Sequence, residues 1–341
     1  MLETIWFILW GLLWAVYFVL DGFDLGLGSL LPFLGKNEEE RRVMYNAAGP
    51  FWDGNEVWLI SAGGVTFAAF PKAYAVMFSA LYAPLLILLF ALIFRAVSFE
   101  FRNKVESDAW RSLWDVVHFL SNLAPCILLG VAFANLFMGI PIDADGVYHG
   151  NLFKLLNLYG LAGGVFFLAI FMMHGALWLT LKSEGHLQTR ALAAANMLWP
   201  AVLVLLLVFL GLTAAYTNLF ANYFAMPLLF ILPVLALVGL LGVPVMLRRG
   251  KPWLAWASSA VFIIFVTFFG VAGMFPGMII SSIDPAATVT AFNGASSQLT
   301  LKIMLGVALV MVPIVLVYQF WVYKLFSAPV TVRDLEDPHA Y

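Results

Sequence analysis

The sequence has very little charge for its length. Of its 341 residues, 11% are charged and 63% are hydrophobic, whereas soluble domains carry about a quarter charged residues. So few charges could not cover the surface of a soluble protein of this size, which excludes a soluble multidomain protein. The 31 Phe, 12 Trp and 13 Met exclude disorder, because disordered segments have the opposite composition. The chain is therefore predicted to be an all-α polytopic membrane protein whose surroundings are the lipid bilayer.

The sequence also lacks the features of several common site classes. It has one cysteine, Cys126, which cannot form a disulfide within the chain and lies in an apolar run, as a small hydrophobic residue would. The net charge of −2 gives no case for a nucleic-acid partner. There is no dinucleotide-binding glycine fingerprint, phosphate loop or paired-cysteine metal spacing. Residues 143–146 (DADG) lack the rest of a calcium loop and are predicted to form a turn.

Long apolar runs are what the sequence has instead. A membrane-spanning helix needs about 20 mostly apolar residues, and internal Gly and Pro are tolerated in such helices. Nine segments meet this requirement, and the division between the sixth and seventh has the weakest signal. The predicted spans are 5–25, 51–70, 75–95, 117–138, 158–181, 192–216, 224–247, 254–275 and 301–325.

The distribution of Lys and Arg predicts the orientation of these spans. With nine spans and the N-terminus outside, fourteen of the 17 Lys and Arg fall on the cytoplasmic side. Only Lys72, Lys154 and Lys302 fall on the outer side. Such a bias is typical of cytoplasmic loops. The sequence therefore predicts an N-terminus outside and a C-terminus in the cytoplasm, with 38–42 (EEERR) as a short solvated helix on the cytoplasmic side.

Acidic residues occur where the predicted spans should exclude them. Asp21 and Asp24 close the first span, and Asp53 and Glu56 open the second, each pair at a three-residue spacing that shares a helical face. Glu100, Asp115 and His118 lie near the cytoplasmic ends of the third and fourth spans. Acids within spans are costly and mark functional sites. The predicted orientation brings these groups to one membrane face, as a proton inlet from the cytoplasm requires.

A structural explanation of the acids stays open at this point. Asp53 or Asp24 could pair with Arg95 or Arg102, and acids at helix ends could serve as interfacial caps. The sequence favours structural roles for Asp21, Glu100 and Asp115, and a functional role for Asp53 and Glu56. Those two are expected to lie deeper, among aromatic residues that include Trp52 and Trp58.

Histidines give little support for a haem within this chain. Only His118 and His174 lie in or beside a predicted span. A membrane haem commonly takes two axial ligands at matched depth. Both histidines lie toward the cytoplasmic side, but nothing in their spacing requires haem ligation. The sequence predicts no metal ligand in this chain.

Several sequence blocks resemble subunit II of the cytochrome bd-type quinol oxidases. They spread over nearly the whole chain, so the resemblance does not rest on a single motif. The blocks are 21–26 (DGFDLG), 49–59 (GPFWDGNEVWL), 62–64 (AGG), 70–71 (FP), 130–135 (GVAFAN), 274–276 (MFP) and 296–301 (SSQLTL).

The resemblance implies a fold of nine membrane helices in two four-helix bundles plus one helix. Applied to this chain, it gives a single integral membrane domain, 1–341, with the first bundle at 1–138, the second at 152–280 and the ninth helix at 297–326. The family's subunit I is similar in fold and carries the b-type and d-type haems and a quinol-oxidising loop. That loop's GRQPW signature is absent from this sequence. This chain is thus expected to be the haem-free partner in a pseudo-symmetric heterodimer.

The implied reaction is quinol oxidation coupled to reduction of O2 to water, with protons taken from the cytoplasm. By position, Asp53 is expected to line the proton path, followed by Glu56 and Asp24, although the family has Gln or Glu at the Glu56 position. Trp58 matches a position implicated in oxygen access. Without the resemblance, a Trp at this place would be interpreted as an interfacial or packing residue. Trp52, Asn55, Arg95 and Glu100 are expected to support these residues as polar or ion-pairing neighbours. No catalytic residue is expected in this chain.

Other features of the complex stay open. Some family members bind a structural quinone in this subunit, but no motif here fixes that site. The quinone type and the attachment of small single-helix accessory subunits are also undetermined by the sequence. The implied location is the cytoplasmic (inner) membrane of a bacterium or archaeon.

Two other functions compete with the oxidase interpretation. A proton-coupled secondary transporter would also place acids among broken helices, but near the membrane midplane between repeats. Here the acids cluster at the cytoplasmic side of the first four spans. A haem-binding cytochrome acting alone is disfavoured by the few histidines within spans.

Overall fold

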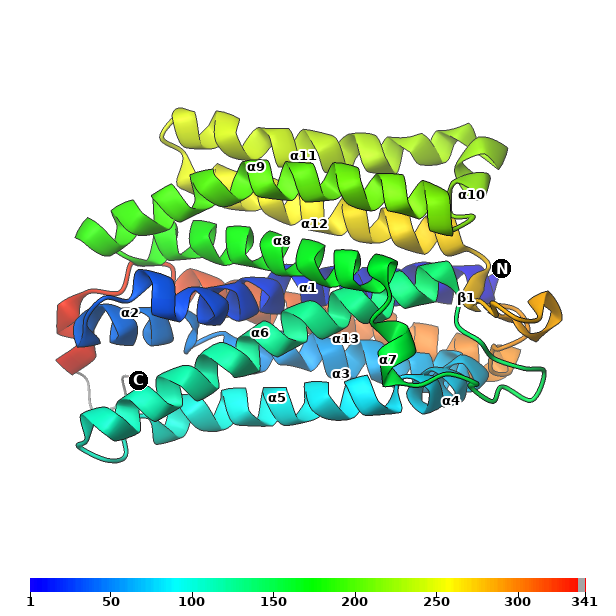
Figure 1. Cartoon of the computed structure of the whole chain (residues 1–341), viewed down its shortest axis with the longest axis horizontal. Helices are drawn as coiled ribbons and strands as arrows, with labels where there is room; N and C mark the ends of the chain where they lie inside the picture. Colours follow the sequence, from blue (N-terminus) through cyan, green and yellow to red (C-terminus); the bar gives the residue numbers. More distant parts are fainter. Residues whose placement is uncertain (337–340) are drawn as a thin grey trace.

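The chain folds almost entirely into helices that run along one long axis (Figure 1). The computed structural model describes residues 1–336 and 341. The helices are α1 (Leu2–Leu34), α2 (Glu38–Ala48), α3 (Trp52–Ala69), α4 (Pro71–Ala80), α5 (Tyr82–Phe101), α6 (Asp108–Met138), α7 (Leu152–Leu155), α8 (Leu158–Lys182), α9 (Gly185–Tyr216), α10 (Phe220–Ala225), α11 (Ile231–Arg248), α12 (Pro252–Met274) and α13 (Gln298–Leu325). Short 3₁₀ helices are η1 (Pro227–Phe230), η2 (Pro285–Ala287) and η3 (Val332–Glu336), and strands β1 (Gly277–Ile279) and β2 (Val289–Thr290) pair antiparallel.

Polar caps set where several of these helices begin. Asn37 caps α2, Ser107 caps α6, Asn157 caps α8 and Ser297 caps α13, each accepting a hydrogen bond from a backbone N–H of the first turn. These side chains satisfy N–H groups that have no partner within the helix. The short helix predicted at 38–42 is confirmed and extends through α2 to Ala48, whereas its cytoplasmic location stays a prediction.

Eight helical segments of the described chain are long and apolar enough to cross a membrane. They are α1, α5, α6, α8, α9, Pro227–Arg248, α12 and α13. The predicted second span corresponds to α3, which has 18 residues and is not among them. Asp53, Asn55 and Glu56 lower the hydropathy of α3. A multi-pass membrane protein is confirmed, and the count of nine stays a prediction.

The predicted boundaries of the third span are wrong. Instead of one span at 75–95, α4 ends at Ala80, a turn follows at Leu81, and α5 runs on to Phe101. Pro84 lies in the first turn of α5, where its missing N–H costs nothing. Arg95 is therefore six residues inside the helix, about 9 Å from its end, rather than at the membrane surface.

The weakest predicted division, between the sixth and seventh spans, is confirmed. Helix α9 ends at Tyr216, and the next long helical segment begins only at Pro227. Asn222 holds the connection against the end of α12, because its side-chain amide donates to the carbonyls of Ala272 and Gly273, both at 3.0 Å.

Helix α1 lies at the centre and packs against α3, α6, α8 and α12. Glycines permit the closest of these contacts. A Cβ on Gly26 would lie 1.8 Å from the carbonyl oxygen of Phe171 on α8, and one on Gly175 would lie 2.5 Å from the backbone of Leu27. Only glycine on both helices allows the backbones to approach this closely.

The remaining contacts give two regions joined by α1 and α8. Helix α5 packs on α6, which packs on both α1 and α8, whereas α9 packs on α8, and α11 packs on α12, which packs on both α1 and α8 (Figure 1). Because α8 contacts both α6 and α9, the division into two four-helix bundles at 1–138 and 152–280 stays a prediction. Helix α13 packs only lightly, on α1 and α3.

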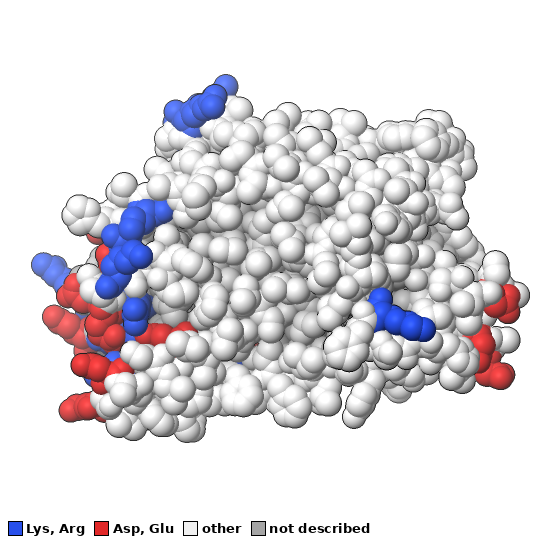
Figure 2. Space-filling view, viewed as in Figure 1, with Lys and Arg blue, Asp and Glu red and all other residues white. Residues whose placement is uncertain are grey.

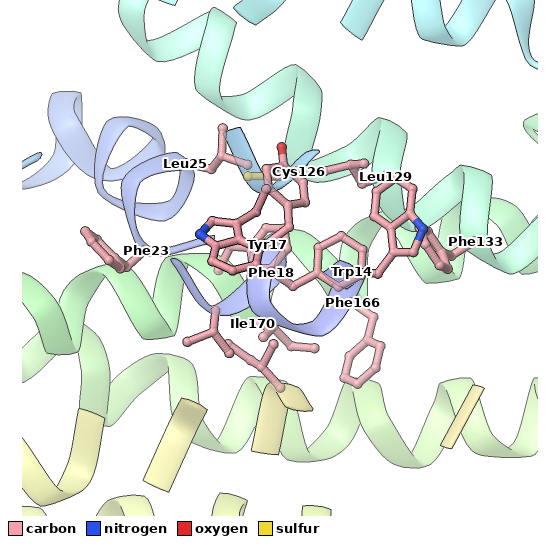
Figure 3. Close-up of a cluster of buried hydrophobic side chains, with 14 of the residues drawn as sticks. Trp14, Tyr17, Phe18, Phe23, Leu25, Cys126, Leu129, Phe133, Phe166 and Ile170 are labelled. Carbon is pink, nitrogen blue, oxygen red and sulfur yellow. The ribbon is translucent and has the colours of Figure 1, made fainter. Parts of the chain in front are cut away.

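An aromatic core joins α1, α6 and α8. The ring centroid of Phe133 lies 5.0 Å from that of Trp14 and 5.2 Å from that of Phe18. Phe18 is also 5.2 Å from Phe167 on α8. Figure 3 shows this region, with Tyr17 and Cys126 among the apolar side chains. Cys126 is buried, as the sequence predicted.

Charge is concentrated at the ends of the helices. On the visible face, Lys and Arg gather at the end where the C-terminus lies, and acids occur at both ends (Figure 2). At the opposite end, residues 143–146 form the predicted turn, with Gly146 at φ +80° and its N–H bonded to the Asp143 carbonyl.

Candidate functional site: a buried polar network beside an apolar cavity

A buried arginine joins acids from two helices. Arg95 of α5 donates to Asp21 of α1 at 2.7 Å and to Glu56 of α3 at 2.7 Å. The side chains of Arg95 and Asp21 are 0% exposed, and that of Glu56 is 22% exposed. Three helices thus meet at one guanidinium, whose fork geometry suits two carboxylates. Asp21 forms a buried ion pair here, and the structural role that the sequence favoured for it stays a prediction.

Asn55 connects the acids to α13. Its side-chain amide donates to Asp24 Oδ2 at 2.7 Å and to the Leu20 carbonyl at 3.1 Å. Its Oδ1 accepts from the Tyr323 hydroxyl at 2.9 Å and from Gln319 Nε2 at 3.2 Å. Asp24 is 3% exposed. Asn55 therefore bridges α1, α3 and α13 from a single buried position.

Trp58 extends the same contact. It is buried, and its Nε1 donates to Gln319 Oε1 at 2.9 Å. Gln319 and Tyr323 were not identified from the sequence. Their spacing could have indicated a polar contact, because a glutamine and a tyrosine four residues apart share a face of the apolar helix α13. The spacing does not show that the partner residue is Asn55.

The residue ranked first for the proton path, Asp53, occupies a different environment from the one expected. It is exposed at the first turn of α3, and its Oδ1 accepts from the Gly54 N–H at 2.6 Å. Asp53 is therefore not deep, because α3 begins only at Trp52. Trp52 itself stacks on Phe99 with ring centroids 5.2 Å apart. Glu100 is exposed at the same end.

The alternative pairings of Asp53 and Asp24 are not found among the described residues. Arg95 pairs with Asp21 and Glu56, and Arg102 pairs with Asp115 and Glu38. Neither arginine forms an ion pair with Asp53 or Asp24 in the described part of the chain.

A second ion-pair cluster lies where α2 meets α5 and α6. Arg102 donates from Nε to Asp115 at 2.6 Å and from Nη2 to Glu38 at 2.8 Å, and Arg41 donates to Asp115 at 2.9 Å. Partial burial opposes the effect, but the hydrogen bond and charge of Arg102 lower the pKa of Glu38. This cluster fixes α2 against α5 and α6. The sequence did not identify Glu38, because its partner comes from another helix.

The two span histidines make different contacts. His174 has both ring nitrogens within hydrogen-bond distance of protein oxygens, Ser259 Oγ at 2.6 Å and the Val19 carbonyl at 3.0 Å. His118 Nδ1 is 2.7 Å from Ser98 Oγ. Neither nitrogen of His174 could bind iron without breaking one of its contacts. Residues 1–336 and 341 contain no group of three or more His, Cys, Asp or Glu side chains placed to hold a metal ion.

An apolar cavity of about 590 Å³ lies beyond the polar network, between α1, α3, α4, α5 and α6. Its volume falls within the range of small-molecule sites, about 300–1,000 Å³. Its wall includes Trp10 and Trp14 of α1, Gly63 and Gly64 of α3 and Tyr74 of α4. The cavity is thus suited to an apolar ligand rather than a charged one.

These features define an integral membrane protein with hydrogen-bonded titratable groups at one end of its helices and an apolar cavity beside them. The chain belongs to the family described as cytochrome bd terminal oxidase subunit II, whose model matches residues 2–326. The resemblance seen in the sequence is confirmed. As a member of this family, the chain is a subunit of a respiratory terminal oxidase, a complex that uses haems and quinol.

Individual relatives support this assignment along the whole chain. Subunit 2 of the cytochrome bd ubiquinol oxidase of Bacillus subtilis (strain 168) is 38% identical, with 98% of each chain covered. Subunit 2 of the cytochrome bd-I ubiquinol oxidase of Escherichia coli (strain K12) is 37% identical, covering 98% of this chain and 97% of the relative. A chain from the bd oxidase structure of Geobacillus thermodenitrificans aligns with a TM-score of 0.77 at 16% identity, covering 95% of this chain and 98% of that one. This last likeness shows a shared fold.

Proposed function

We propose that this chain is the haem-free subunit II of a quinol:oxygen oxidoreductase that reduces O2 to water. It pairs with subunit I, which carries the b-type and d-type haems and the quinol-oxidising site, in a bacterial or archaeal cytoplasmic membrane. The observation that carries the proposal is the polar network that joins acids of α1 and α3 to α13 at the lysine- and arginine-rich end. Its contribution is proton uptake from the cytoplasm and stability of the complex.

The proposed topology has nine spans with the N-terminus outside. Helix α3 is the span with low hydropathy, because it carries Asn55 and Glu56, which bond to protein groups. Such pairing makes polar residues acceptable within a membrane. Glu56 bonds to Arg95, and Asn55 bonds to Asp24. The gathering of Lys and Arg at the C-terminal end (Figure 2) supports a cytoplasmic location for that end.

Protons enter at Asp53 in this proposal. Asp53 is exposed at the start of α3, and Glu56 lies one helical turn further in, which gives an exposed acceptor followed by a partly buried one. Asp24 lies beyond, fully buried and bonded to Asn55. The exposure of Asp53, unexpected from the sequence, suits a residue that collects protons from water.

Asp53 is tested by the Asp53→Asn variant of the assembled complex. An amide keeps the size of the side chain but cannot pass a proton, so oxygen consumption should fall about tenfold while haem content stays near that of the parent. The expected tenfold fall is smaller than the ~100-fold loss of rate on removing a positioned acid or base. Asp53 is exposed, so water can partly replace its carboxylate in collecting protons. The matched control is Asp143→Asn, an acid of the opposite end. Equal turnover in Asp53→Asn and the parent would remove Asp53 from the path.

The surface that receives subunit I is proposed to be the free face of α3 together with α13. Val57, Ile60 and Phe67 are exposed apolar residues of α3, and a Cβ on Gly63 or Gly64 would meet no described atom within 4 Å. Small residues on an exposed helix face allow a second helix to approach closely within a membrane. Helix α13 adds a long, largely exposed apolar surface beside it.

A pair of glycine variants tests this surface. Gly64→Leu should abolish co-purification of subunit I, because the added side chain occupies the position of the partner helix. Gly211→Leu of α9 is the control, since Gly211 also has no described atom within 4 Å of an added Cβ but lies in the other region. Recovery of subunit I in equal amounts with both variants would exclude this face of α3.

A structural quinone fits the apolar cavity in this proposal, and the cavity borders the surface that receives subunit I, because Ile60, Gly63, Gly64 and Phe67 of α3 line it. An isoprenoid quinone is apolar along most of its length, and the wall formed by α1, α3, α4, α5 and α6 offers almost only carbon surface. Trp58 borders the polar network rather than this cavity. Its hydrogen bond to Gln319 supports the packing of α13, and in this proposal Trp58 lines an oxygen route at the interface with subunit I.

Purification with and without subunit I separates the oxidase from a proton-coupled transporter. A d-type haem spectrum that appears only when the partner is present supports the proposal. A chain that is stable alone and moves a solute across vesicles would establish the transporter instead. Small single-helix accessory subunits would appear in the same purification as additional bands.

A further inference from the structure

Three cations at the turn between α11 and α12 lie apart from the charge networks described above. Arg248, Arg249 and Lys251 are exposed, and none of them forms an ion pair in the part of the chain that the structure describes, whereas arginines of α2, α5 and α6 do. The reason lies in the sequence, because no Asp or Glu occurs between Glu184 and Asp284. In Figure 2 the Lys and Arg atoms at this end of α11 and α12 have no Asp or Glu beside them on the visible face. The turn is therefore a positive patch that its own region does not neutralise.

The turn lies at a membrane surface. The segments that it joins, Pro227–Arg248 and α12, are both long and apolar enough to cross a membrane. Gly250 has a φ of +67°, which favours glycine, and the Lys251 N–H donates to the Met246 carbonyl at 3.0 Å. The backbone thus reverses within a few residues, and the three charged side chains leave it close together. Their level is that of the lipid headgroups, on whichever side of the membrane this end lies.

An exposed apolar stripe of α11 ends at these cations. Val238, Leu241 and Val245 are exposed, and their intervals of three and four residues place them on one face of the helix. Arg248 and Arg249 follow Val245 at the next such interval. From residue 238 to residue 248 the helix rises about 15 Å, roughly half of the ~30 Å apolar core of a bilayer. The stripe is therefore as long as the apolar part of one lipid leaflet, with positive charge at its surface end.

Trp253 of α12 adds an amphipathic ring at the same level. Its side chain is exposed, and its ring stacks on that of Trp256 with centroids 5.2 Å apart. Trp256 stacks in turn on His174 of α8 at 5.0 Å, so a packed column of rings fixes the exposed one. Tryptophan rings at membrane interfaces prefer the level of the headgroups. A soluble anion would contact the cations alone, whereas a phospholipid contacts the cations, the ring and the apolar stripe.

We propose that Arg248, Arg249 and Lys251 bind the phosphate-bearing headgroup of an anionic phospholipid, with one acyl chain along the apolar stripe of α11. The phosphate oxygens accept hydrogen bonds from the guanidinium and ammonium groups. A lipid with net negative charge is favoured over a zwitterionic one, because the turn offers no carboxylate to an ammonium group. Each cation near an anionic surface strengthens binding about fivefold, and the three together roughly a hundredfold. The site goes beyond the proposed function, because it uses no residue of the proposed proton path or of the surface for subunit I.

The first test counts lipids on the purified complex. The complex is equilibrated in detergent micelles that contain equal amounts of dioleoylphosphatidylglycerol and dioleoylphosphatidylcholine, and native mass spectrometry measures the retained molecules. The parent should retain at least one more phosphatidylglycerol than the triple variant Arg248→Gln, Arg249→Gln, Lys251→Gln, whereas both should retain phosphatidylcholine equally. Equal retention of phosphatidylglycerol by the parent and the triple variant would overturn the proposal.

Two control variants separate this turn from charge in general. Lys72→Gln with Lys154→Gln and Lys302→Gln removes three exposed cations from the other end of the helices and should retain the lipid as the parent does. Arg248→Lys with Arg249→Lys keeps the charge of the turn and should retain the lipid too. Loss of the lipid from the first control to the same extent as from the triple variant would show that net charge holds it, and would reject the site.

The second test uses the parent complex, because loop cations also orient membrane helices and the triple variant is compared only where its haem content equals that of the parent. Added phosphatidylglycerol should raise the thermal midpoint by mass action, and phosphatidylcholine should raise it less. The difference should shrink at about 1 M salt, where the Debye length falls from about 8 Å to about 3 Å. Equal midpoints with the two lipids at low salt would contradict the proposal. Inorganic phosphate or an acidic protein retained in place of the lipid in the first test would also contradict it.

Discussion

The two regions of this protein solve the burial of polar groups in opposite ways. The region of α1, α3, α5 and α6 buries charge, with Arg95 held between Asp21 and Glu56. The region of α8, α9 and α12 buries neutral pairs along its helices, such as Tyr159 with Thr213 at 2.9 Å, and its buried Lys182 lies at the last residue of α8. Both are apolar helical assemblies of similar construction. The difference supports the proposed proton uptake through the first region, because neutral pairs are sufficient to hold the helices of the other region together.

The energetic consequences of the two solutions also differ. Removing one member of a buried ion pair leaves an uncompensated charge and costs about 3–5 kcal/mol. Removing one member of a neutral hydrogen bond costs about 1–3 kcal/mol when the partner stays buried. Variants in the two regions should therefore fall into separate ranges of stability loss.

The largest effect is expected for Arg95→Gln. Asp21 and Glu56 would face each other without their shared cation, and we expect a loss of about 3–5 kcal/mol, measured as a large fall in the thermal midpoint of the purified complex. The double variant Arg95→Gln with Asp21→Asn should recover part of this loss, because it removes one of the unpaired charges. A single variant as stable as the parent would show that the ion triad does not determine the stability of this region.

A smaller effect is expected for His174→Gln in the other region. The variant loses at least one of the contacts to Ser259 and the Val19 carbonyl, at a cost of about 1–3 kcal/mol. Haem content of the complex should not change, because both ring nitrogens contact protein oxygens. Loss of one haem with the fold intact would assign His174 as a ligand and contradict the neutral role of this region.

The smallest effect is expected from acid on the Arg102 cluster. The lowered pKa of Glu38 contributes stability that is present above its ordinary value of 4.5 and is lost as the pH falls through the lower, folded-state pKa. Thermal midpoints measured from neutral pH down to below 4.5 should decline less steeply in Glu38→Gln than in the parent. Glu39→Gln, an exposed acid of the same helix, is the control. Identical slopes in all three would show that the Arg102 cluster contributes no pH dependence.

Most of the helical architecture could be predicted from the sequence, because apolar runs of bilayer length are a strong one-dimensional signal. The ends predicted at residues 138, 181, 216 and 325 lie within one residue of the observed ends of α6, α8, α9 and α13. The boundaries of the third span were predicted wrongly because hydropathy does not distinguish α4 from α5. The turn at Leu81 interrupts the apolar run without a polar residue to mark it.

The candidate site was predicted less completely. Asp24, Glu56, Asn55 and Arg95 are brought together as expected, since acids and an arginine within spans must find partners. Their pairing was not predictable, because Arg95 reaches Asp21 from 74 residues away and Tyr323 reaches Asn55 from 268 residues away. The depth of Asp53 was also misjudged, because it depends on the residue at which α3 begins.

Composition and the order of apolar and charged residues determined by themselves that this chain is a multi-pass membrane protein, and its motifs determined its family. Both follow from local chemistry, because a bilayer accepts only long apolar helices and tolerates charge at few positions. The tertiary structure alone decided which charges neutralise one another and that α13 completes the polar network. Those outcomes depend on which helix faces meet, and no single segment of the sequence contains that information.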